Sequence, residues 1–152
     1  ALLLNVLALG ATRHPVDADT WRAWAAGYRW GVFHGREQLG FAPLFGHQYS
    51  HVWIDFRGIR DSVMTARGLD YFENSRRATL AQRGYAMRNP SGFRGYGPDT
   101  WGLTACDGPL DSTLMLDGRS RQFHTYDARG ACFTRIGDDG TLAPFALNGV
   151  AA

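Results

Sequence analysis

The sequence contains no lysine: all 16 of its lysine or arginine positions are arginine. The arginines are scattered, and a net charge of +2 without a basic patch argues against a nucleic-acid partner. Only two cysteines are present, Cys106 and Cys132, and their spacing fits no common metal site. The apolar run at residues 1–10 is too short to cross a bilayer and lacks the flanks of a signal peptide. We therefore expect a globular chain without a membrane-spanning segment.

The composition is that of an ordinary globular protein that can bury a core. The 152 residues are 45% hydrophobic and 20% charged. Aromatic residues make up 13% of the chain, which suits a thick core or a surface that stacks on ligands. Residues 1–10 resemble the last turns of a helix that Gly10 ends, and residues 141–152 resemble the start of another. We therefore expect residues 1–152 to be the middle portion of one larger domain, truncated at both ends.

The apolar periodicity predicts a mainly α-helical fold with long loops and one β-hairpin. An Asp117-Gly118 turn between two alternating runs places the hairpin within residues 112–127. A short helix is also expected from Thr100. The longer predicted helices cover residues 17–30 (capped by Asp17 or Asp19), 47–68 (with a break near Gly58) and 70–90. The predicted loops cover residues 35–46, 91–109 and 128–144.

The stretch HQYSH, residues 47–51, differs in one letter from the H-E-x-x-H signature of zinc proteases. On a helix His47, His51 and Asp55 share one face, and His/His/Asp is a legitimate zinc ligand set. Gln48 stands where the protease has its general base, and no further cluster of ligands follows. The alternative is that both histidines form hydrogen bonds where the helix packs against its neighbours. We expect no metal here.

The sequence contains only two glutamates, Glu37 and Glu73. Glu73 stands three residues after Asp70, which is the arrangement of a helix capping box. Arg76 and Arg77 follow at pairing distance on a helix and would favour the ionised carboxylate, the wrong form for a general acid. The residues alone therefore allow both a structural and a catalytic role for Glu73.

Several aspartates and aromatic residues lie in glycine-bearing loops. Asp107 and the Asp138-Asp139 pair are explained by turn chemistry, but the same loops could direct carboxylates into a cleft. Inverting hydrolysis of a sugar needs two carboxyl groups that flank the scissile bond. Trp53, Tyr96 and Trp101 adjoin polar groups and are candidates for stacking on sugar rings, whereas Trp21 and Trp24 follow a helical core period.

Four long strings occur here in the order found in the bacterial glycoamylase-like family: FGHQYSHVWIDFRGIRD, YFENSRRATLAQR, NPSGFRGYGPDTWGLTACDGP and DDGTLAP. The chain resembles this family, which is related to endo-β-1,2-glucanases and to the barrel domains of cyclic β-1,2-glucan synthases. The resemblance implies a partial (α/α)6 toroid, inverting cleavage of β-linked glucans by carboxylates without a metal or cofactor, and a parent protein that is periplasmic or secreted. It also implies that the similarity of HQYSH to a zinc motif is accidental.

The resemblance identifies Glu73 as the expected general acid, facing the loops that carry Trp101 and Asp107. The expected partner is an oligo- or polysaccharide. Two alternatives are a non-catalytic carbohydrate-binding protein, which needs no reacting carboxylate, and a zinc hydrolase that uses His47 and His51. The expected substrate-binding residues are His47, His51, Trp53, Asp55, Arg57, Trp101, Asp107 and Asp139.

Overall fold

The computed structural model describes residues 2–143. Its helices are α1 (Leu2–Leu9), α2 (Ala18–Ala26), α3 (Phe45–Gln48), the 3₁₀ turn η1 (Tyr49–Val52), α4 (Ser62–Ala66) and α5 (Tyr71–Arg88). Its strands are β1 (Trp30–Phe33), β2 (Arg36–Leu39), β3 (Ala105–Asp107), β4 (Ser112–Leu116), β5 (Arg119–Phe123), β6 (Tyr126–Ala128), β7 (Gly130–Cys132) and β8 (Arg135–Gly137). The helix predicted at the end of the chain lies outside the described residues beyond residue 143.

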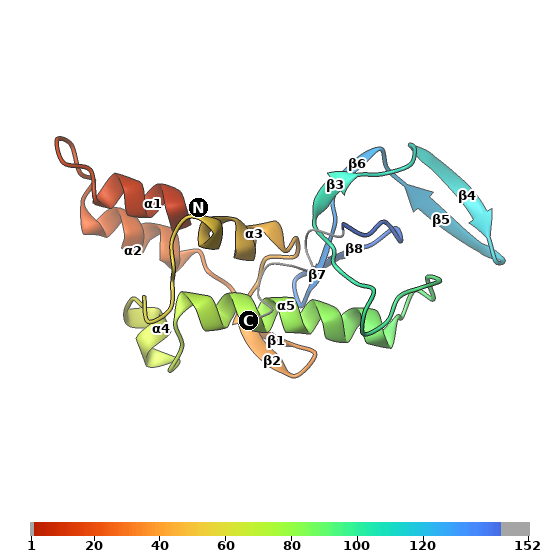
Figure 1. Cartoon of the computed structure of the whole chain (residues 1–152), viewed down its shortest axis with the longest axis horizontal. Helices are drawn as coiled ribbons and strands as arrows, with labels where there is room; N and C mark the ends of the chain where they lie inside the picture. The colour runs from red at the N-terminus through yellow and green to blue at the C-terminus, as the bar shows by residue number, and fades with distance from the viewer. Residues whose placement is uncertain (1, 144–152) are drawn as a thin grey trace.

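Helix α5 joins the two parts of the molecule (Figure 1). The other helices gather around its N-terminal half, and strands β3 to β8 lie beside its C-terminal half. The predicted helix at residues 70–90 is confirmed at both ends. Asp70 caps it by accepting a 2.7 Å hydrogen bond from the Glu73 N–H, and Asn89, with a left-handed φ of 42°, ends it before Pro90.

The predicted helix at residues 47–68 is wrong. The chain turns through the short α3 and the tighter η1, and then runs without regular structure until Asp61 caps α4. Asp61 accepts from the Met64 N–H at 2.8 Å, so a new helix begins where the sequence period implies continuation. The break predicted near Gly58 is confirmed, because Gly58 adopts a φ of 76°, which a helix interior cannot contain. His47, His51 and Asp55 therefore do not lie on one helical face.

The described residues contain more β-structure than predicted. The β4–β5 hairpin with its Asp117-Gly118 turn (φ of 50° and 73°) is confirmed. Two further hairpins, β1–β2 and β7–β8, lie in segments predicted as helix end or loop, and β3 pairs with β6 across the β4–β5 hairpin. Residues 100–104 form no helix. The fold is thus mixed helices and short antiparallel strands, and strands of three or four residues are too short for an alternating pattern to reveal.

The buried face of α5 organises the core and fixes the loops around it. Phe56, Met64, Leu69 and Tyr71 form one buried cluster with Leu39 of β2. Two buried amides of α5 bind loop and strand backbone. Asn74 accepts from the Leu39 N–H at 2.9 Å, and Gln82 donates to the carbonyls of Ala42 and Leu103 and accepts from the Leu103 N–H. In the part of the chain that the structure describes, no helix has the length and apolarity needed to cross a membrane.

Candidate functional site

The N-terminal end of α5 brings together four of the predicted site residues, His51, Asp55, Arg57 and Glu73. The cap residue Asp70 connects them, because one of its oxygens accepts from the Glu73 N–H and the other accepts from the Gly58 N–H at 2.9 Å. This second bond holds the segment after η1 against the start of α5. The exposed Asp55 and Arg57 pair with each other at 3.2 Å. A further contact places the Arg57 guanidinium 4.4 Å from the centre of the Phe72 ring.

His51 lies between this segment and the second turn of α5. Its Nε2 is 2.9 Å from the Ser75 hydroxyl, and its ring contacts Phe56 at a centroid distance of 4.9 Å. Burial lowers the pKa of His51, although the carboxylates of Asp55 and Asp70 act in the opposite direction. The imidazole therefore serves at neutral pH as an uncharged hydrogen-bonding group.

The Glu73 carboxylate is fixed by the two arginines that follow it. Its Oε1 accepts from Arg77 Nε at 3.0 Å, and its Oε2 lies 3.4 Å from an Arg76 guanidinium nitrogen. The side chain is 34% exposed, and it projects from α5 on the side away from the buried Tyr71 and Asn74. Both oxygens of the carboxylate are therefore occupied by guanidinium groups.

A cavity of about 330 Å³ opens on the other side of the first turns of α5. It combines aromatic rings with polar groups, the composition that suits a sugar ligand. Phe41 and Phe45 remain 45% and 41% exposed and meet edge to face at 5.6 Å. The polar lining includes Arg29, His47, Asn74 and Ser75, and the aromatic lining also includes Trp24, Tyr28 and Tyr71. The cavity is therefore a candidate sugar-binding pocket next to Glu73's helical turn.

His47 is buried in the wall of this cavity. Its Nε2 lies 3.1 Å from the Phe41 carbonyl oxygen, which can only accept, so Nε2 carries the proton. Burial lowers the pKa of His47 from 6.5 to about 4, despite this hydrogen bond. With Nε2 protonated, only Nδ1 of His47 keeps a lone pair for a metal ion. Among residues 2–143 no group of three His, Cys, Asp or Glu side chains is placed to hold a metal ion. The geometry gives no support to a zinc hydrolase.

The buried, neutral His47 predicts a loss of stability in mild acid. The unfolded chain takes up a proton near pH 6.5 and the folded chain only near pH 4, so His47 leaves stability intact above pH 6.5 and diminishes it as the pH falls toward 4. The loss is on the order of 3 kcal/mol. Urea unfolding between pH 7 and pH 4 measures it. His47→Gln keeps a donor to the Phe41 carbonyl and should flatten the dependence of the free energy of unfolding on pH in this range. The control His14→Gln, at an exposed position, should not flatten it. An unchanged pH dependence in His47→Gln contradicts the prediction.

Trp53 directly follows η1, close in sequence to His51 and Asp55, and is 64% exposed. The other predicted residues, Trp101, Asp107 and Asp139, lie away from the N-terminal end of α5. Trp101 is only 9% exposed and packs against Leu44 and Ala86 in the core. Ala86 follows Glu73 by thirteen residues on α5, which is about 20 Å along the helix axis. Glu73 therefore does not face the loop that carries Trp101, contrary to the expectation from sequence. Glu73 lies near the N-terminal end of α5, whereas Trp101 packs near its C-terminal end.

Asp107 and Asp139 also lie toward the C-terminal end of α5. Asp107 is exposed on β3, opposite Tyr126 of β6. Asp139 is buried and forms two 2.7 Å bonds with the guanidinium group of Arg129. Both carboxylate oxygens of Asp139 are thus occupied by a buried ion pair, which is a structural arrangement.

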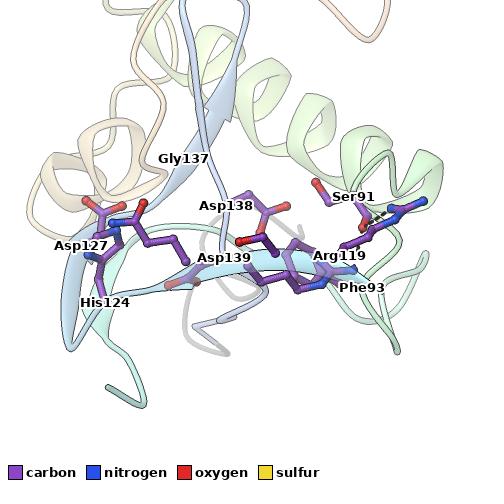
Figure 2. Close-up of a pocket in the computed structure, with 11 residues that line it drawn as sticks. Ser91, Phe93, Arg119, His124, Asp127, Gly137, Asp138 and Asp139 are labelled. Carbon is purple, nitrogen blue, oxygen red and sulfur yellow. Dashed lines mark hydrogen bonds between the residues drawn. The ribbon is translucent and has the colours of Figure 1, made fainter. Parts of the chain in front are cut away.

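A second cavity, of about 430 Å³, lies beside β5 and the turn at residues 137–139 (Figure 2). It presents Asp138, which sequence reasoning explained as a turn residue. The Asp138 carboxylate accepts from the Tyr85 hydroxyl at 2.8 Å, the Tyr96 hydroxyl at 2.7 Å and the Gly140 N–H at 3.0 Å. These tyrosines precede Asp138 by 53 and 42 residues, so no local sequence signal identifies the group.

Comparison with known proteins relates the chain to proteins that act on glucans. An exo β-1,2-glucooligosaccharide sophorohydrolase (non-reducing end) of Parabacteroides distasonis is 37% identical over 65 residues, which is 43% of this chain and 8% of that protein. A putative glucoamylase from Bacteroides caccae has a similar structure, with a TM-score of 0.74 and 29% identity over 94% of this chain and 32% of that one. The endo-β-1,2-glucanase of Chitinophaga pinensis, in complex with sophorotriose and glucose, gives a TM-score of 0.66 and 26% identity over 88% of this chain and 30% of that one.

The chain spans about a third of the length of these solved structures and a far smaller share of the sophorohydrolase. At the level of families, the model described as "Putative glucoamylase" matches residues 1–151, nearly the whole sequence. The chain belongs to this glycoamylase-like family.

Proposed function

We propose that this chain is part of a glycoside hydrolase that cleaves β-1,2-linked glucans with inversion. The observation that carries the proposal is its similarity to relatives named for β-1,2-glucan hydrolysis, one of them in complex with sophorotriose. Because the chain spans only part of these relatives, their activity is proposed for the full-length protein and not for residues 1–152 alone.

Glu73 is the carboxylate that we propose to take part in the reaction. Its half-exposed position leaves it accessible to a ligand, and Asp70 and the segment after η1 hold its surroundings in place. The resemblance assigns it the role of general acid, and its carboxylate forms ion pairs with Arg76 and Arg77. In an inverting enzyme one carboxyl group protonates the leaving oxygen and the other activates water. The pH dependence of turnover distinguishes the two roles.

The residues around Glu73 supply what a neutral sugar requires. Asp55 and Arg57 offer acceptor and donor groups at the surface, and Trp53 offers an exposed ring. The cavity behind α5 adds Asn74 and Ser75 beside two exposed phenylalanines. Sugar sites combine such aromatic faces with a few directed polar groups. We propose that the surface with Trp53, Asp55 and Arg57 binds sugar rings next to the scissile bond.

A non-catalytic carbohydrate-binding protein is the second candidate. The observation in its favour is that both oxygens of Glu73 are occupied by guanidinium groups, so that the aromatic and polar surfaces could bind a glucan without reacting with it. A binding protein retains glucan and releases no reducing ends.

The linkage and stereochemistry are tested with the full-length protein. We expect β-1,2-glucan to be hydrolysed and β-1,3-glucan and starch to remain intact, because the named relatives act on β-1,2 linkages. Reducing-end assays and chromatography measure the products, and proton NMR during the first minutes should show the α-anomer if water attacks with inversion. Hydrolysis of starch with β-1,2-glucan left intact contradicts the linkage, and an initial β-anomer contradicts the inverting mechanism.

A further inference from the structure

The cavity beside the β4–β5 hairpin lies far from Glu73 but is built from polar side chains that are held in place. Figure 2 shows Ser91, Phe93 and Arg119 on one side, His124 and Asp127 on the other, and the Asp138-Asp139 pair between them. These residues come from the loop after α5, from β5, from β6 and the residue before it, and from the turn after β8, so that four segments of the chain meet around the space.

Asp138 is the fixed acceptor of this cavity. A carboxylate offers about four lone-pair sites, and Tyr85, Tyr96 and Gly140 occupy three of them. Burial and the neighbouring carboxylate raise the pKa of Tyr85 to about 12 and that of Tyr96 as well, so both hydroxyls stay protonated and donate to Asp138. The remaining lone-pair site of Asp138, which lines the cavity, is therefore an acceptor whose position is fixed before a ligand arrives.

Arginines of β5 provide the donors. Arg119 and Arg121 both donate to the Ser91 carbonyl, at 3.2 and 3.1 Å, and the Arg121 guanidinium lies 4.2 Å from the centre of the Phe93 ring. Each guanidinium has five N–H groups, so donors remain after these contacts. The contacts hold both side chains against the loop that follows α5.

The mixture of charges decides the class of ligand. Asp127 and Asp138 beside Arg119 and Arg121 disfavour a strongly anionic or cationic ligand, and the polar lining disfavours an apolar one. Alternating fixed donors and acceptors suit a neutral, polyhydroxylated molecule.

The cavity is too far from Glu73 to share its reaction. Tyr85, which donates a hydrogen bond to Asp138, follows Glu73 by twelve residues on α5, or about 18 Å along the axis. Inverting carboxyl pairs are ~6.5–9.5 Å apart, so Asp138 cannot act with Glu73 on one bond.

We infer that this cavity is a distal subsite, which binds a sugar unit of the same glucan chain several units away from the cleavage point. The inference rests on the proposed function. Such a subsite strengthens the binding of long chains and leaves the chemistry of the scissile bond unchanged. Short oligosaccharides that cannot reach from Glu73 to the cavity gain nothing from it.

The test compares long β-1,2-glucan with sophorotriose as substrates of the full-length protein. Arg121→Gln and Asp138→Asn should raise KM for the long glucan roughly tenfold, leave kcat within about twofold, and leave KM for sophorotriose unchanged. Gln122→Ala, at an exposed lining position, gives a second variant if Asp138→Asn does not fold. The matched control is Thr113→Ala, because Thr113 pairs with Gln122 across the hairpin and does not line the cavity.

The outcomes separate this inference from the proposed function. If the wild type hydrolyses β-1,2-glucan and folded cavity variants leave the KM of the long glucan unchanged, the subsite is absent while the function stands. An equal rise in KM for both substrates also overturns the subsite, because it indicates a general disturbance of binding. If the wild type hydrolyses no β-1,2-glucan and binds none in affinity electrophoresis, both proposals fail together.

Discussion

Replacement of Glu73 by glutamine is expected to lower kcat on β-1,2-glucan by roughly 10²–10⁴-fold, with little change in substrate binding. The amide keeps the size of the side chain but can neither give nor take the proton that the reaction requires. The cap of α5 survives, because Asp70 accepts from the backbone N–H of residue 73 and not from its side chain. The two lost ion pairs are partly exposed and contribute at most about 1 kcal/mol, so the variant should fold normally.

The chain contains its own matched control for this change. Glu37 is the other glutamate, and it pairs with Arg67 at a partly exposed position on β2. Glu37→Gln removes the same charge from a similar ion pair and should leave kcat unchanged. A folded Glu73→Gln protein that turns over within a few-fold of the wild type would show that the ion pairs of Glu73 are its whole role. A protein that still binds β-1,2-glucan and never cleaves it, in either form, would favour the carbohydrate-binding alternative.

If Glu73→Gln lowers kcat as expected, the pH profile of kcat/KM identifies the role of Glu73. A general base must be ionised, so its titration appears on the acidic limb of the kcat/KM profile, whereas a general acid appears on the alkaline limb. The limb that is missing from the residual activity of Glu73→Gln therefore identifies the role of Glu73.

Those parts of the fold that depend on local signals could be predicted from the sequence. Helix α5 has a cap residue at its start and a proline beyond its end, and the β4–β5 hairpin has an Asp-Gly turn between alternating runs. Gly58 indicated a break in the segment 47–68, but the end of the helix already at η1 could not be predicted, because the apolar period continues through residues that turn to fill the core below α5. Phe56 and Met64 are both buried there, although no helix joins them. Tertiary packing decides the backbone in such a segment.

The site could be predicted only where its residues are close in the sequence. His51, Asp55 and Arg57 lie within seven residues, and the structure places them together at the N-terminal end of α5. Trp101 could not be separated from the exposed tryptophans, because its burial depends on Leu44 and Ala86, which come from two other segments. The acceptor group at Asp138 depends in the same way on Tyr85 and Tyr96. Periodicity and motifs do not carry information on such distant pairs.

Arg129 and Asp139 form a buried ion pair between residues ten positions apart, which no local sequence pattern indicates. This pair predicts a large effect on stability. Arg129 is fully buried, binds both oxygens of Asp139 at 2.7 Å, and donates to the carbonyls of Cys106 and His124 at 2.7 and 2.8 Å. Burial would raise the pKa of Asp139, but the bonds from Arg129 and Thr141 outweigh it and hold the pKa below its usual value. One side chain thus connects β3, the end of the hairpin segment and the turn after β8.

Arg129→Met should therefore destabilise the folded protein by about 3–5 kcal/mol, because it leaves a buried carboxylate and two carbonyls without their donor. Urea unfolding at pH 7 measures the loss.

The matched control is Arg135→Met, which removes a half-exposed 3.6 Å ion pair with Asp127 and should lower the free energy of unfolding by under about 1 kcal/mol. The double variant Arg129→Met/Asp139→Asn should recover part of the loss, and acidification should narrow the deficit of Arg129→Met, since both remove the unpaired charge. A deficit that is no larger than that of Arg135→Met, or that widens in acid, would mean that the guanidinium does not support the turn that shapes the cavity.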